Sequence, residues 1–141
     1  MENKNAYIIV HERGMKHLIP AENIVRIESV RVYSIFHLRN STQQFVSSRN
    51  LGKVQHELNP EMFLRVHRSH IINLYEVKAF KNARCGKVIL SDGTVINVAQ
   101  RRKTEFLKHL SQLNKKTKWE NARIKNDPRA IIRIDITKHT R

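Results

Sequence analysis

The sequence predicts a mainly β fold with two helical segments, and three observations support this. Short apolar segments recur from Tyr7 to Ala99 between turn residues at close spacing, as in small all-β domains. Two further segments repeat their apolar residues at helical spacing. A length of 141 residues with 40% hydrophobic residues suits one domain with a single core.

Nine segments have the β-branched and aromatic content of strands and are bounded by turn residues. The expected strands cover residues 7–10, 15–18, 24–27, 33–38, 44–47, 70–74, 76–80, 87–90 and 95–98. Between the last two, Asp92-Gly93 separates apolar residues. This pair predicts a hairpin with a two-residue type I′ turn, in which both residues take a positive φ.

The first helix is expected at about residues 50–58. Leu51, Val54 and Leu58 recur at helical spacing, and Asn59-Pro60 ends the segment. The second helix is expected to begin near Arg101. Its apolar stripe is formed by Phe106, Leu107, Leu110 and Leu113, and it is followed by Asn114.

The composition changes after residue 113. Residues 114–141 carry nine Lys and Arg against three Asp and Glu. We therefore expect a domain over residues 5–113 and a basic C-terminal tail over residues 114–141. Within the tail, residues 130–134 are compatible with an extra strand or with disorder.

Charge is the strongest compositional signal. Lys and Arg number 27 against 12 Asp and Glu, which gives a net charge of +15 and a pI of about 10.6. Such a balance predicts an acidic partner, first of all nucleic acid. Cys85 is the single cysteine, so no intramolecular disulfide is expected. Without an apolar run of about 20 residues or a signal segment, the protein is expected in the cytoplasm and not in a membrane.

The densest polar cluster covers residues 65–70 and allows three interpretations. His67 and His70 suggest a metal site, but no Cys or carboxylate lies beside them. A nuclease using a histidine as base would need a carboxylate partner, and residues 65–75 contain none. The third interpretation is a nucleic-acid contact, with Arg68 suited to guanine and Ser69 to a phosphate.

Two further segments are candidates for nucleic-acid contact. Arg101, Arg102 and Lys103 stand where a strand ends and a helix begins, and three cations there oppose the helix dipole, which favours a contact over a purely solvated turn. Arg31 and Tyr33 lie between two expected strands. For these two residues, a DNA contact and an ordinary strand role remain equally open.

Three stretches carry a resemblance to a known family. Residues 63–74 read FLRVHRSHIINL, residues 88–94 read VILSDGT, and residues 19–29 read IPAENIVRIES. Together with the basic start of the last helix, they resemble the LytTR DNA-binding domain of bacterial response regulators. The resemblance covers about residues 5–113, and the long ordered run in the first stretch is its most specific part.

The resemblance implies an elongated antiparallel β fold whose inter-strand loops enter the major groove of promoter direct repeats, with two chains on each DNA site. It places base contacts at Arg68 and Arg101, and in the loop around Arg31 and Tyr33. It places contacts with the DNA backbone at three residues, namely Ser69, Arg102 and Lys103. Many members have Ser-Arg where this chain has Ala99-Gln100, which removes one phosphate-binding hydroxyl.

The expected function is therefore a sequence-specific double-stranded DNA-binding regulator of transcription, consisting of a LytTR domain without a receiver. No catalytic residue, metal ion or cofactor is expected, and the upstream signalling partner is unknown. The alternative is a basic RNA-binding module. The low aromatic content of 6% and the lack of an aromatic pair for base stacking argue against it.

Overall fold

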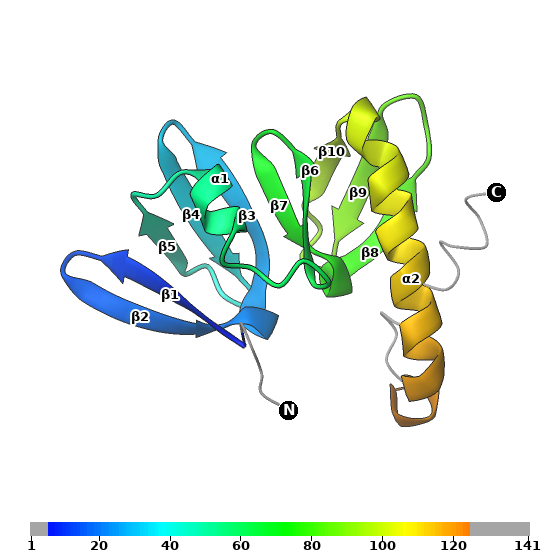
Figure 1. Ribbon diagram of the computed structural model, residues 1–141, viewed down its shortest axis with the longest axis horizontal. Coiled ribbons are helices and arrows are strands. Elements are labelled where there is room, and N and C mark those ends of the chain that lie inside the picture. Colours follow the sequence, from blue (N-terminus) through cyan, green and yellow to red (C-terminus); the bar gives the residue numbers. More distant parts are fainter. Residues whose placement is uncertain (1–5, 125–141) are drawn as a thin grey trace. The chain divides into compact units, whose positions relative to one another are not determined.

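The computed structural model describes residues 6–124, with side chains up to residue 113 (Figure 1). The chain divides into two compact units, which meet in the sequence at Asn73 and Leu74. Each unit has its own sheets, and the expectation of one domain with a single core stays a prediction.

The first unit contains two antiparallel sheets and one short helix. β1 (Tyr7–Glu12) pairs with β2 (Met15–Pro20). The second sheet has five strands in the order β5-β4-β3-β7-β6. Its strands are β3 (Ile24–Val30), β4 (Tyr33–Leu38), β5 (Gln44–Ser47), β6 (Phe63–His67) and β7 (His70–Asn73). A 3₁₀ turn, Ala21–Asn23, leads from the first sheet to the second.

The core of the first unit forms from alternate residues of both sheets and from α1 (Leu51–Gln55). Leu51 and Val54 of α1 are buried, one helical turn apart. The helix begins after Asn50, whose side chain accepts a hydrogen bond from the Lys53 N–H at 2.9 Å. The buried cluster contains Ile8, Val10, Ile19, Ala21, Ile24, Ile27, Phe36, Leu51, Val54, Leu58, Phe63 and Ile71.

The second unit is a three-stranded antiparallel sheet with a long helix. The strand order is β10-β9-β8, and a 3₁₀ turn (Leu74–Glu76) precedes the sheet. The elements are β8 (Val77–Lys81), β9 (Gly86–Leu90), β10 (Val95–Val98) and α2 (Gln100–Ile124). Phe80 of β8 packs against Phe106 of α2 with ring centroids 5.0 Å apart. Leu110 and Leu113 are buried with Phe106, so the predicted apolar stripe faces a core.

The mainly β fold with one short and one C-terminal helix is confirmed. The strands at 33–38, 44–47 and 95–98 agree with their predicted bounds, and the other predicted strands differ by a few residues. Strand β6 was not predicted. Its Arg65 and His67 alternate with buried Leu64 and Val66, and the dense charge concealed this period of two.

The hairpin at Asp92-Gly93 is confirmed, but its turn is different from the predicted one. Only Gly93 has a positive φ, +89°. The Leu90 carbonyl accepts from the Gly93 N–H at 2.8 Å, and the Leu90 N–H donates to the Thr94 carbonyl at 2.9 Å. This pattern is a three-residue loop with glycine in the left-handed position. Asp92 instead uses its carboxylate to accept the Thr94 N–H at 2.9 Å, so it needs no positive φ.

Helix α2 begins at Gln100, one residue before the predicted start, and continues past Asn114 to Ile124. Asn114 alone does not end it, since asparagine costs a helix interior much less than glycine or proline. The proposed strand at 130–134 lies outside the described residues, and the boundary at 113 stays a prediction. Within residues 6–124, no helix is both long enough and apolar enough to cross a membrane.

Candidate nucleic-acid interface

Two tight turns lie at the same end of the five-stranded sheet. Arg31 and Val32 connect β3 to β4, and Arg68 and Ser69 connect β6 to β7. Strands β3 and β7 are antiparallel neighbours, with Glu28 opposite His70. The Ser29 N–H donates to the Ser69 carbonyl at 2.8 Å. The structure therefore brings the two candidate segments of the first unit together at one end of the sheet (Figure 1).

The β3–β4 turn is exposed and conformationally strained. Arg31 has a φ of +59°, a left-handed conformation that costs a residue with a side chain about 1–2 kcal/mol. Val32 is 65% exposed and Tyr33 is 45% exposed. No described side chain forms a hydrogen bond with Arg31 or Tyr33. A cation, an aliphatic group and an aromatic ring thus project from this turn toward solvent.

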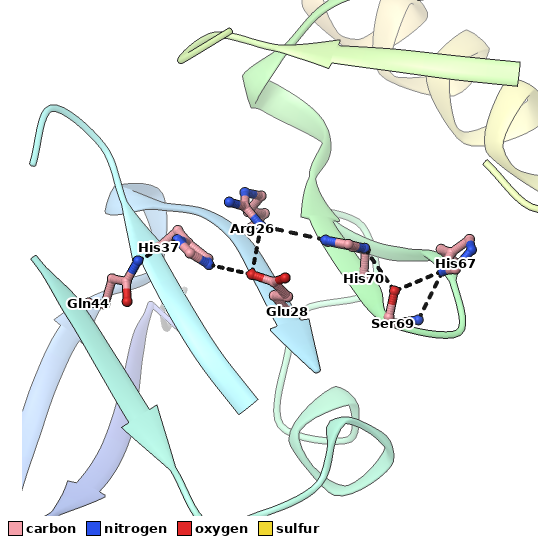
Figure 2. A network of polar contacts seen from close by, with 7 residues as sticks. All are labelled: Arg26, Glu28, His37, Gln44, His67, Ser69 and His70. Carbon is pink, nitrogen blue, oxygen red and sulfur yellow. Dashed lines mark hydrogen bonds and ion pairs between the residues drawn. The ribbon is translucent and has the colours of Figure 1, made fainter. Parts of the chain in front are cut away.

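The β6–β7 turn is held by a histidine on each side of Ser69 (Figure 2). The Ser69 N–H donates to His67 Nδ1 at 3.2 Å, so that nitrogen carries no proton. Ser69 Oγ lies 2.9 Å from the same nitrogen and must therefore donate its hydroxyl proton to it. His70 Nδ1, 3.0 Å from Ser69 Oγ, must then be the donor to that oxygen. One hydroxyl thus links the last residue of β6 to the first residue of β7.

The main chain of Arg68 is fixed, while its side chain is exposed. The Arg65 guanidinium donates from Nη2 to the Arg68 carbonyl at 2.6 Å and from Nε to the His67 carbonyl at 3.4 Å. These bonds tie the turn to the strand that enters it. The backbone of Arg68 is thus ordered before any ligand arrives, which reduces the ordering cost of binding through this turn.

The hydrogen bonds of the β6–β7 turn continue as a network of polar side chains that crosses all five strands of the sheet. Arg26 Nη1 lies 3.5 Å from His70 Nε2 and donates to Glu28 Oε1 at 3.2 Å. His37 Nε2 lies 3.0 Å from the same carboxylate oxygen and donates to it. His37 Nδ1 then accepts from Gln44 Nε2 at 3.3 Å. Figure 2 shows the continuous path from β5 through β4, β3 and β7 to the turn after β6.

Two groups in this network have shifted pKa values. Burial lowers the pKa of His70 from 6.5 to about 4, and the charge of Arg26 adds to this effect, although Glu28 acts in the opposite direction. Burial raises the pKa of Glu28, but the His37 hydrogen bond and Arg26 outweigh it, so the pKa falls below 4.5. His70 is therefore neutral at pH 7, as the hydrogen-bond directions require.

The metal interpretation of His67 and His70 finds no support in the geometry. Both Nδ1 atoms are directed at Ser69, and the ring centroids are 6.1 Å apart. In the part of the chain that the structure describes, no group of three or more His, Cys, Asp and Glu side chains is arranged to hold a metal ion.

The remaining candidates lie at the start of α2 in the second unit. Arg101 is exposed, whereas Arg102 and Lys103 are half-buried. The Arg102 N–H donates to the Ala99 carbonyl at 2.8 Å. Lys103 Nζ donates to the Ala83 carbonyl at 2.8 Å, which leaves two of its three N–H groups for another acceptor. These three residues belong to the second unit, whereas the two turns belong to the first.

Sequence reasoning missed the residues that support the β6–β7 turn, namely Arg26, Glu28, His37 and Arg65. One signal was present in the sequence. Arg26 and Glu28 alternate with buried Val25 and Ile27 inside an otherwise apolar strand, which indicates one polar face of a sheet.

The mainly antiparallel β fold and the exposed arginines on its tight turns fit a nucleic-acid-binding domain. The family model described as the LytTr DNA-binding domain matches residues 15–111. The chain belongs to this family, and the resemblance inferred from the sequence is confirmed. The matched residues include both turns and the start of α2.

Similar proteins agree with this assignment. Over 42 residues the chain is 40% identical to the CO-responsive transcriptional regulator RcoM of Rhodospirillum rubrum, covering 30% of this chain and 18% of that protein. Over 86 residues it is 28% identical to the transcriptional regulatory protein LytR of Staphylococcus aureus, covering 60% of this chain and 34% of that protein. The chain thus spans about a third or less of the length of these relatives.

A solved LytTr DNA-binding domain from Bacillus cereus shows the same fold. The TM-score is 0.64 at 18% identity, and the alignment covers 74% of this chain and 96% of that domain.

Proposed function

We propose that the chain regulates transcription by binding double-stranded DNA in a sequence-specific manner through its inter-strand turns. The observation that carries this proposal is the exposed Arg68 on a turn whose main chain is fixed by Arg65, His67 and Ser69. Family membership supports DNA binding. The names of both relatives support a role in transcriptional regulation.

Base reading is assigned to the exposed residues. Arg68 and Arg101 present a planar guanidinium that can donate two parallel hydrogen bonds to one guanine in the major groove. Arg31 and Tyr33 lie at the same end of the sheet as Arg68. They supply one further cation and one ring for base or methyl contacts.

Backbone contacts are assigned to Arg102, Lys103 and Ser69. The first two are cations at the start of α2. Ser69 differs from them because its hydroxyl proton is already donated to His67. A phosphate oxygen can only accept. A contact of Ser69 with phosphate therefore requires its hydroxyl to rotate away from His67 when DNA binds.

Two chains are proposed to bind side by side on direct repeats in a promoter, one chain on each repeat. No catalytic step is assigned to the chain. The site offers exposed cations, and its two imidazoles, His67 and His70, are both hydrogen-bonded to Ser69. The rival function, RNA binding, would use the same charge on a different ligand.

The test is a selection of preferred DNA from random duplexes, followed by gel shifts on the selected site. Excess double-stranded DNA of that sequence should compete, and single-stranded RNA of the same sequence should not. Binding should weaken with salt by about 0.9 log units per phosphate contact for each log unit of salt. Arg102→Ala should lower that slope by about one contact and leave the base preference intact. Equal competition by RNA would overturn the proposal.

A further inference from the structure

The second unit carries cations that none of these assignments uses. Lys81 ends β8, Lys87 lies in β9, and Arg84 stands in the loop that joins the two strands. All three side chains are exposed. We refer to Lys81, Arg84 and Lys87 as the β8–β9 basic surface.

This surface is unfavourable for the stability of the fold. Lys81 and Lys87 are directly opposite each other in the antiparallel register, and like charges in that position destabilise a sheet. The next residue across is Asn97, whose side-chain oxygen accepts from Lys87 Nζ at 2.9 Å. Within the described residues, neither Lys81 nor Arg84 forms an ion pair. A carboxylate at any of these positions would relieve the repulsion, and none is there.

Acidic residues are few in the second unit. Residues 74–113 contain eight Lys and Arg but only three Asp and Glu, namely Glu76, Asp92 and Glu105. Glu76 is fully buried and hydrogen-bonded by Ser91, and Asp92 lies in the turn at the other end of β9. The positive charge at the Lys87 end of the sheet is therefore not neutralised by this sheet.

The basic surface is continuous with the start of α2. Val98, the last residue of β10, is paired with Gly86, the first residue of β9, and α2 begins two residues later. Lys103 Nζ holds the loop through the Ala83 carbonyl at 2.8 Å. Close packing fixes this arrangement, since a Cβ on Gly86 would lie 3.0 Å from the Phe80 ring and 3.3 Å from Lys103 Cδ. The loop cations and Arg101 thus occupy one end of the second unit.

We infer that the β8–β9 basic surface is a further DNA-contacting site, at which Lys81, Arg84 and Lys87 bind backbone phosphates beside the duplex contacted by the start of α2. Adjacent lysines that repel each other in the free protein gain stability when a polyanion lies across them. Flexible ammonium groups act as point charges and read no bases. The site deepens the proposed function and rests on it.

The test compares two variants with the same change in net charge. Lys81→Gln/Arg84→Gln/Lys87→Gln removes the surface, and Lys16→Gln/Lys53→Gln/Lys108→Gln removes three exposed cations from other elements. On the selected DNA site, the first variant should lower the salt slope by up to about 2.7 and preserve the rank order of base variants. Its melting temperature without DNA should rise slightly, because the cross-strand repulsion is lost. Equal salt slopes for the two variants would overturn the inference.

Cys85 provides a second measurement on the unaltered sequence. It is the single cysteine, exposed and next to Arg84. An iron-chelate cleavage reagent attached to its Sγ should cut the bound duplex over one short stretch at a fixed distance from the selected sequence. Binding without cuts would contradict the site while leaving the proposed function intact. Failure of the unlabelled wild-type chain to bind any duplex would instead remove the proposed function.

Discussion

The β3–β4 and β6–β7 turns at one end of the five-stranded sheet differ in the contacts that hold them. The β6–β7 turn is fixed by side chains, because Ser69 bridges His67 and His70 and Arg65 binds its main chain. The β3–β4 turn is held by backbone bonds, including that from the Ser29 N–H to the Ser69 carbonyl, and places Arg31 in a left-handed conformation. One end of the sheet thus presents an arginine on a turn braced by side chains beside an arginine on a turn that no described side chain braces in this way.

This difference assigns the turns different parts in recognition. The backbone that carries Arg68 is already ordered, so binding through this turn costs less conformational entropy, while the exposed guanidinium itself is ordered only on binding. The β3–β4 turn has no such side-chain bonds among the described residues, so we expect contacts of Arg31 and Tyr33 to cost more conformational entropy on binding. Substitutions at the two turns should therefore behave differently, even in the free protein.

The largest effect on stability is expected from Ser69→Ala. Loss of the hydroxyl leaves His70 Nδ1 without its acceptor and removes one donor to His67 Nδ1. We expect a loss of about 1–2 kcal/mol in the free energy of unfolding in urea, near the lower end for unsatisfied groups because the site is only partly buried. Exposed Ser48→Ala is the control and should change little. Unchanged stability of Ser69→Ala, combined with weaker binding to all DNA, would instead make Ser69 purely a phosphate contact.

A stabilising change is expected at the other turn. Arg31→Gly removes the strain of a φ of +59°, partly offset by the greater backbone entropy of unfolded glycine. The unfolding free energy should rise by up to about 1 kcal/mol while affinity for the selected DNA falls. The neighbouring Val32→Gly, at a residue without a positive φ, should lower stability. If Arg31→Gly is destabilised like its neighbour, the turn is not strained.

Acid should weaken the β6–β7 turn through His70. Its pKa is lowered from 6.5 to about 4 in the folded chain, so the unfolded chain takes up the proton first. The stability contribution is complete above pH 6.5 and is lost as the pH falls toward 4. His70→Gln should remove this dependence, with an effect under about 1 kcal/mol between pH 7.5 and 5.5 because solvent screens the half-buried ring. Parallel urea titrations of both chains at the two pH values measure it, and equal pH slopes would contradict the shifted pKa.

The sequence predicted the elements whose signals are local. The apolar alternation at 33–38, 44–47 and 95–98 and the helical stripe ending at Leu113 needed no knowledge of distant partners. Strand β6 was missed because its pairing with β7 depends on residues across a turn, while its own composition is dominated by charge. The turn at Asp92 was mistaken because its side chain offered an alternative bond that composition does not reveal.

The candidate site was predictable in its exposed residues and not in their support. Arg68 and Arg101 could be selected from charge, motif and position, and both are exposed. The contact of Arg26 with His70 joins residues 44 positions apart, so it depends on the pairing of β3 with β7. Sequence spacing cannot give such a contact. The bridging position of Ser69 between two imidazoles involves close neighbours in the sequence, but it depends on the tight turn between β6 and β7, and it was not foreseen because strand β6 was missed.

Base reading by the β6–β7 turn is tested most directly by selecting preferred duplexes from a random pool. The wild-type chain and Arg68→Ala are used in parallel. The wild-type chain should select a defined repeat. Arg68→Ala should lose preference at one or two positions in each repeat, equivalent to about 1–3 kcal/mol of discrimination, with an almost unchanged salt slope. If Arg68→Ala selects the same sequence with the same rank order of base variants, Arg68 does not read bases, and the preorganised turn has another purpose.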